Sequence, residues 1–271
     1  MSMDRIRQAF STKAFIGFLT GGDPSLADTR RYVNLMARAG VSLVEIGIPF
    51  SDPIAEGPVI QDANVRALSA HTTPEKLFRL VQVLREEDGV TVPIAFMTYL
   101  NPVHHYGYPQ FFARASEVGV DALIVPDLPY EEHGEVRDIA AESGVALISM
   151  IAPNSAERIR MIAADAKGFI YLVSSMGVTG VRSEISTDIA SIVKEIRTVT
   201  DVPVAVGFGI STPAQAAELG RDADGVIVGS AIVRIIAEYG SHADAALETY
   251  VREMVAALGD PVAARDNGRM A

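Results

Sequence analysis

Short hydrophobic runs recur along the chain, and each is followed by a turn-forming residue and then by a segment with helical spacing. Runs that are hydrophobic at nearly every position are typical of strands buried on both faces of a parallel sheet. The pattern predicts eight strands, at residues 15–19, 43–47, 94–99, 122–125, 146–151, 169–173, 204–206 and 226–228. It predicts helices between and after them at residues 26–39, 74–86, 109–117, 131–143, 156–166, 188–198, 213–219 and 232–238.

Several predicted helices are bounded by residues with capping chemistry. A hydroxyl before a helix can accept a hydrogen bond from a free N–H of the first turn. The residues in this position are Ser25, Thr73, Ser155 and Ser211 or Thr212. Glycines follow three helices, where a left-handed residue commonly ends the helix, at Gly40, Gly144 and Gly220.

Eight strands alternating with helices indicate a single (β/α)8 TIM barrel. A doubly wound sheet is the alternative, although it has fewer strands and usually a glycine-rich turn after the first one. The length of 271 residues allows one large domain or two small ones, and no Pro/Gly/Ser-rich linker divides it. We therefore expect one catalytic domain at residues 1–258 and a flexible tail at 259–271.

Composition excludes several classes of protein. With 49% hydrophobic and 21% charged residues the chain is not intrinsically disordered, and a net charge of −11 argues against nucleic-acid binding. The absence of cysteine excludes disulfides and thiolate chemistry and is compatible with the cytoplasm, where we expect the protein. Residues 1–10 do not resemble a signal peptide, and prolines break the longest uncharged run, 89–113, so we expect no membrane segment.

Two connections are long, after the second and the sixth predicted strand, and in a barrel both rise from the face that carries the active site. The last two strands end in glycine turns that contain Gly209 and Gly229. Their N–H groups, with Ser230 and with Gly180 of the sixth loop, are suited to bind a phosphate. Ordinary strand–helix turns are the alternative interpretation.

Glu45 is the most informative single residue. By alternation it shares the face of Leu43, so its carboxylate is expected to point into the barrel mouth, where burial raises its pKa. Such a group can both take and give a proton. The alternative is a structural carboxylate bonded to a backbone N–H. Glu56 and Asp52, in the loop after the second strand, are either site residues or solvated, and Tyr171 is either a site residue or core.

Other catalytic routes lack the necessary residues. None of the four lysines is placed to form a Schiff base, and the five histidines do not form a set of metal ligands. We therefore expect no metal. Any cleavage of a carbon–carbon bond would need a substrate that supplies its own electron sink.

Six segments with specific chemistry lie in order on the predicted loops and strands: 19–24 (LTGGDP), 45–53 (EIGIPFSDP), 171–174 (YLVS), 177–180 (GVTG), 207–211 (GFGIS) and 229–233 (GSAIV). Over residues 15–238 the chain resembles the α subunits of tryptophan synthase. The resemblance implies cleavage of indole-3-glycerol phosphate to indole and glyceraldehyde 3-phosphate, without a cofactor. A separate β subunit, a PLP enzyme, then uses the indole.

The resemblance also implies roles for individual residues. Glu45 would deprotonate the glycerol hydroxyl and deliver a proton to C3 of the indole. Where the family has an aspartate that binds the indole N–H, this chain has Glu56, one methylene longer, and we expect it to keep that role. Tyr171 and Thr179 would order the lid. Phosphate would be held by Gly180, Gly209, Gly229 and Ser230, and the indole would be surrounded by Phe18, Met97, Tyr99, Ile124, Met150 and Phe208.

The same comparison predicts a surface for the β subunit, formed by Asp52, Pro53, Asn101, Pro102 and Pro129. Three other functions remain open. The first is a stand-alone lyase that needs no partner. The second is a non-catalytic phosphate-binding subunit that regulates its partner, and the third is another sugar-phosphate enzyme such as an epimerase. The presence of Glu45 argues against the non-catalytic subunit.

Overall fold

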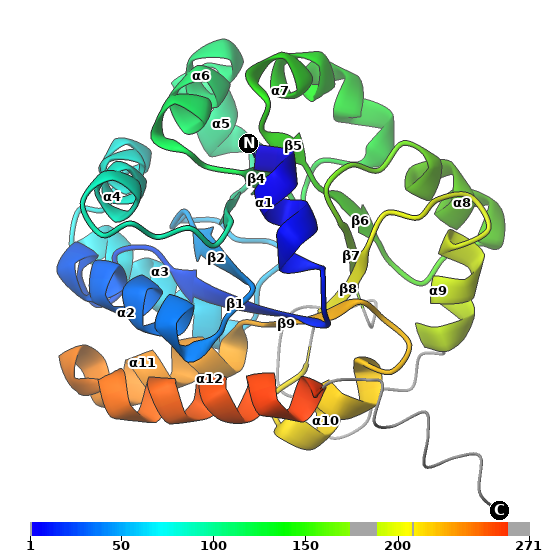
Figure 1. The fold of residues 1–271 in the computed structure, drawn as a ribbon. Coiled ribbons are helices and arrows are strands. Elements are labelled where there is room, and N and C mark those ends of the chain that lie inside the picture. Colours follow the sequence, from blue (N-terminus) through cyan, green and yellow to red (C-terminus); the bar gives the residue numbers. More distant parts are fainter. Residues whose placement is uncertain (1, 174–188, 208, 260–271) are drawn as a thin grey trace, which may run out of the picture.

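The computed structural model describes residues 2–173, 189–207 and 209–259. Nine strand segments form one parallel sheet in the order β5-β4-β3-β2-β1-β9-β8-β7-β6 (Figure 1). Their bounds are β1 Ala14–Thr20, β2 Leu43–Gly47, β3 Ile94–Met97, β4 Ala122–Ile124, β5 Ala146–Leu147, β6 Ser149–Ile151, β7 Ile170–Val173, β8 Val204–Gly207 and β9 Gly225–Val228.

The ends of this order, β5 and β6, are two parts of one stretch separated by Ile148, whose N–H donates to the carbonyl of Leu123 at 2.9 Å. The sheet therefore closes through the chain itself, with β5 bonded to β4 and β6 bonded to β7. The predicted eight-stranded TIM barrel is confirmed, and the doubly wound alternative is wrong. The predicted strand at 146–151 is divided because it changes partners at Ile148.

Helices surround the sheet. They are α1 Ser2–Ala9, α2 Leu26–Ala39, α3 Pro58–Ser69, α4 Pro74–Glu86, α5 Leu100–Tyr106, α6 Tyr108–Val118, α7 Arg137–Ser143, α8 Ala156–Ala164, α9 Ile189–Ile196, α10 Pro213–Leu219, α11 Ser230–Tyr239 and α12 Asp244–Leu258, with 3-10 turns η1 Tyr130–Glu135 and η2 Gly240–His242. Four of them, α1, α3, α5 and α12, were not predicted. The predicted helix at 131–143 is divided into η1 and α7.

The caps follow local chemistry. Ser25, Thr73, Ser155 and Thr212 each accept a hydrogen bond from the first turn of the helix that follows. Gly40 and Gly144 end their helices in the left-handed conformation, as predicted. The prediction for Gly220 is wrong: its φ is −63°, and its N–H still donates to the carbonyl of Ala216, so the helical turn continues through it.

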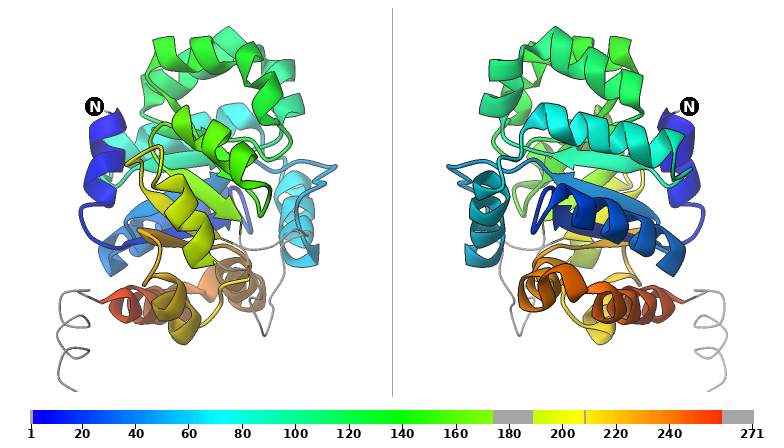
Figure 2. Two further views of the ribbon diagram at one scale, coloured as in Figure 1. Left: turned by 90° about the vertical axis from the view of Figure 1, so that its right-hand side faces the viewer. Right: turned by 90° about the vertical axis from the view of Figure 1, so that its left-hand side faces the viewer.

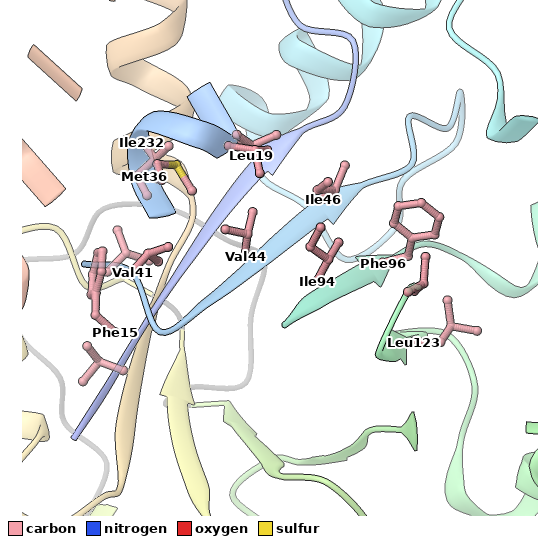
Figure 3. Close-up of a cluster of buried hydrophobic side chains, with 14 of the residues drawn as sticks. Phe15, Leu19, Met36, Val41, Val44, Ile46, Ile94, Phe96, Leu123 and Ile232 are labelled. Atoms are coloured by element: carbon pink, nitrogen blue, oxygen red, sulfur yellow. The ribbon is translucent and has the colours of Figure 1, made fainter. Parts of the chain in front are cut away.

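The core has two layers because side chains alternate along each strand. Phe15, Leu19, Val44 and Ile46 face the surrounding helices, where they meet Met36 and Ile232 (Figure 3). The alternate positions fill the barrel interior, with Ile16, Leu43 and Ile124 among them. Glu45 lies between Val44 and Ile46 on β2, so it belongs to the interior side.

Two helices cover the ends of this interior. Ile6 of α1 joins the interior cluster, and Phe10, just after α1, packs on Phe169 with ring centroids 5.5 Å apart. At the other end α3 packs on the mouth, since its Ile60 and Ala63 contact Phe18. The side views show α1 and α3 at opposite ends of the barrel (Figure 2). The mouth lies at the carboxyl ends of the strands.

The loop after the sixth predicted strand, residues 174–188, and residues 260–271 of the expected tail lie outside the described residues. The domain boundary at residue 258 stays a prediction, although α12 ends there. Among the described helices none combines the length and the apolar character needed to cross a bilayer.

Candidate active site

Glu45 stands in the barrel mouth. β2 pairs it with Phe18 of β1 and Ala95 of β3, and its side chain is completely buried. Neither carboxylate oxygen has a hydrogen-bond partner within the described residues. The alternative in which Glu45 is a structural acceptor for a backbone N–H is therefore wrong. Burial raises the pKa of Glu45 to about 8, so at neutral pH the carboxyl holds a proton that it can exchange.

Tyr171 reaches the same interior from β7. It is buried in the cluster that fills the barrel, and burial together with the charge of Glu45 raises the pKa of its hydroxyl. Gly207 on the neighbouring β8 leaves room for it, because a Cβ at this glycine would lie 2.5 Å from Tyr171 Oη. The Tyr171 hydroxyl therefore lies against the backbone of β8 at Gly207, where any residue with a side chain would collide with it.

The predicted indole pocket is an apolar wall around Glu45. Ile124 belongs to the interior cluster, and Met97 and Met150 pack against it. Phe18 and Met97 also contact α3 above the mouth. The described members of the predicted pocket that come from strands, Phe18, Met97, Ile124 and Met150, are thus brought to one space. Phe208 lies outside the described residues.

Tyr99, the remaining member of that set, holds the loop after β2. It is buried, its Oη accepts a hydrogen bond from the N–H of Ala55 at 3.0 Å, and its ring packs on Phe50 at 5.4 Å between centroids. The contact fixes the chain just before Glu56.

Glu56 is buried rather than solvated, with 8% of the residue exposed. Burial raises its pKa to about 7, and the hydrogen bond that Asn64 Nδ2 donates to Glu56 Oε2 at 2.6 Å opposes this rise. Gln61 Nε2 also donates to the Glu56 carbonyl at 2.8 Å. A second carboxylate with a raised pKa therefore lies just before the first turn of α3, which packs on the mouth.

Sequence reasoning missed the residues that hold this segment. Asn64 and Gln61 donate hydrogen bonds to Glu56. Arg66 binds both carboxylate oxygens of the buried Asp23, each at 2.8 Å. The detectable signal was Asn64, a polar residue on the otherwise apolar buried face of a helix. The Asp23–Arg66 pair left no such signal, because 43 residues separate its partners.

The glycine turns border the same mouth. Gly229 precedes α11, and no side chain caps the first turn of that helix, which begins at Ser230. A Cβ at Gly229 would lie 3.3 Å from Phe18, so the N-terminus of α11 adjoins the apolar wall. Gly209 has a φ of +83°, which favours glycine. Gly180 and Thr179 lie outside the described residues.

The residues predicted to meet a partner follow the carboxyl ends of three neighbouring strands, β2, β3 and β4. Asp52, Asn101 and Pro129 are exposed, and Pro53 and Pro102 are partly exposed. In the described part of the chain no group of three or more His, Cys, Asp or Glu side chains could hold a metal ion.

Known proteins resemble this chain in sequence and in fold. The family model for the tryptophan synthase alpha chain matches residues 5–259. The tryptophan synthase alpha chain of Lactiplantibacillus plantarum is 50% identical over 247 residues, 91% of this chain and 92% of that one. The alpha chain structure from Legionella pneumophila has a TM-score of 0.84 at 32% identity, covering 98% of this chain and 99% of that one.

A second similar structure comes from a study of mutual activation in the tryptophan synthase a2b2 complex of Pyrococcus furiosus. It has a TM-score of 0.79 at 35% identity and covers 90% of this chain and 98% of the other.

Proposed function

Because this chain belongs to the tryptophan synthase alpha chain family, we propose that it is a carbon–carbon lyase that cleaves indole-3-glycerol phosphate to indole and glyceraldehyde 3-phosphate. The observation that carries the proposal is the Glu45 carboxylate, buried in the mouth without a hydrogen-bond partner among the described residues. Burying such a group is costly, and a substrate that exchanges a proton with it accounts for its position.

In the proposed reaction a proton moves from the substrate's hydroxyl to its ring. Protonation of indole C3 makes the ring an electron sink, the C3–glycerol bond breaks, and its electron pair returns to the ring. The hydroxyl on the departing carbon loses its proton and becomes the aldehyde. Glu45, with a pKa of about 8, is suited to give the first proton and to take the second.

Glu56 stabilises the positive charge that develops on the ring by accepting a hydrogen bond from the indole N–H. The apolar wall of Phe18, Met97, Ile124 and Met150 binds the ring and keeps water away from the reacting carbon. Tyr171 and Thr179 help to order the long loop that follows β7, which serves as a lid in this proposal.

The phosphate is bound by the backbone of Gly209 and Gly229, by Ser230 and by Gly180. Helix N-termini bind anions through their free N–H groups and their dipole. This local attraction is needed because the protein has a net charge of −11 and the substrate is itself an anion.

The partner is the tryptophan synthase β subunit, which would bind the exposed loops after β2, β3 and β4 that carry Asp52, Asn101 and Pro129. Ile54, 74% exposed in the first of these loops, offers an apolar contact. We expect the reaction to run in the cytoplasm and without a cofactor in this chain. No observation favours a purely regulatory subunit over a lyase.

Release of indole from indole-3-glycerol phosphate tests the proposal directly. We expect the purified protein to form indole, and a cognate β subunit to increase the rate. Turnover at full rate without the partner would favour a stand-alone lyase. A protein that binds the substrate analogue indole-3-propanol phosphate and forms no indole, alone or with the partner, would be a binding subunit instead.

Glu56→Ala is expected to lower kcat about 10²-fold, because it removes a charge that stabilises the transition state. The matched comparison is Glu56→Asp, which keeps the carboxylate and restores the family's residue, and which is expected to retain more activity than Glu56→Ala. Steady-state kinetics of indole formation measures both. Turnover of Glu56→Ala within a few-fold of wild type would show that Glu56 does not have this role.

A further inference from the structure

Asn64 is the one polar member of the buried face of α3, which otherwise consists of Ile60, Ala63 and Ala67. A buried amide needs a hydrogen-bond partner inside the protein, because leaving it unpaired is costly. That partner is Glu56, whose Oε2 accepts from Asn64 Nδ2 at 2.6 Å, with both side chains buried. The bond joins two residues that lie eight positions apart in the chain.

α3 gives this contact a fixed base. Arg66, two positions after Asn64, binds both oxygens of Asp23 and so ties the helix to the loop after β1. Ile60 and Ala63 pack on Phe18 in the mouth. Gln61 holds the Glu56 carbonyl, so the Glu56 backbone is bound to the same helix as its side chain. The position of the carboxylate is therefore set by α3.

We propose that Asn64 is the positioning residue for Glu56: it binds Oε2 and leaves Oε1 for the ring N–H of the substrate. The inference rests on the proposed function and deepens it, because it says how a glutamate serves where the family has an aspartate. The longer side chain has one more rotatable bond, and Asn64 restricts it. A carboxylate misplaced by about 1 Å can cost about 10²-fold in rate.

The charged and titratable groups around Glu56 are few. Tyr99 follows β3, and burial, together with the charge of Glu56, raises the pKa of its hydroxyl. Arg66, two positions after Asn64 on α3, forms an ion pair with Asp23 at 2.8 Å. Asn64 itself is neutral, and its N–H stabilises the ionised form of Glu56. Loss of the Asn64 donor should therefore move the titration of Glu56 to higher pH.

Asn64→Leu removes the donor and keeps the branched shape and the number of heavy atoms of the side chain. We expect the Glu56 carboxyl, followed by ¹³C NMR in the substrate-free protein, to titrate at higher pH than in the wild type. We expect kcat of indole formation to fall about 10²-fold. In a Glu56→Gln background the same substitution should change kcat by no more than a few-fold. Ser69→Ala, on the exposed side of α3, is the control that should leave both readouts unchanged.

The two proposals fail in different ways. If Glu56 titrates at the same pH in wild type and Asn64→Leu, Asn64 does not position the carboxylate, whatever the activity. If the titration moves but the wild type forms no indole, the pairing stands and the proposed function falls. Asn64→Ala, measured in the same way, decides the matter should leucine not fit beside Glu56.

Discussion

Glu45→Gln is expected to lower kcat of indole formation about 10²- to 10⁴-fold, the range attributed to a general acid–base residue. Glutamine has nearly the same size and can occupy the same buried position between Phe18 and Ala95. It can neither take a proton from the hydroxyl nor deliver one to C3. The measurement is indole release at saturating substrate, with and without the β subunit. A variant that keeps its rate within a few-fold would remove Glu45 from the mechanism.

Stability provides the control for this experiment. The pKa of Glu45 is about 8 in the folded protein and 4.5 ordinarily, so between these values the folded state holds a proton that the unfolded state has lost. Wild-type stability therefore falls as pH rises through that window. Glu45→Gln lacks this group, and we expect it to be more stable than wild type by roughly 5 kcal/mol above pH 8 and about equal near pH 4.

Urea unfolding at several pH values measures the difference. Loss of activity together with this gain in alkaline stability would show that the variant is folded and chemically disabled. Equal pH dependence in the two proteins would mean that Glu45 is ionised in the fold, contrary to its burial.

The second large effect is expected at the opposite end of the barrel. Asp121 is fully buried, and its carboxylate accepts hydrogen bonds from Arg5 at 2.7 Å, Arg85 at 2.6 Å and the N–H of Ile94 at 2.9 Å. Asp121→Ala leaves the Arg85 guanidinium with only backbone carbonyls, those of Gly119, Val90 and Val92, and no carboxylate to balance its charge. Burial already lowers the pKa of Arg85 to about 10. We expect a loss of about 3–5 kcal/mol in the free energy of unfolding.

Chemical denaturation gives this value, and Glu248→Ala is the matched control. Glu248 forms a 2.7 Å ion pair with Arg252 on the surface of α12, where both side chains are largely exposed. Its removal should cost less than about 1 kcal/mol. A similar small cost for Asp121→Ala would show that Arg5 and Arg85 find other partners or water.

Much of the barrel was predictable because local patterns determine local structure. The eight hydrophobic runs all appear as strands, and the hydroxyl caps at Ser25, Thr73 and Ser155 form as expected. Alternation placed Glu45 on the interior side, since its neighbours Val44 and Ile46 face the helices. Successive side chains of a strand point to opposite faces, so a residue between two outward-facing neighbours must point inward.

The unpredicted parts depend on contacts between distant residues. α3 lies in a long connection, and its apolar face is buried only because it packs on Phe18 in the barrel mouth. Gly220 departs from its prediction for a local reason instead: its N–H donates to the carbonyl of Ala216, four positions earlier, so the helical turn continues through it.

The sequence by itself determined the order of strands and helices, the inward direction of Glu45 and the glycines beside the mouth, because neighbours a few positions apart set these features. Only the tertiary structure decided that the loop after β2 folds back as α3 and that Asn64 binds Glu56. It also decided that Asp23 and Arg66 pair across 43 residues. Such contacts depend on how layers pack in space, and no periodicity along the chain encodes them.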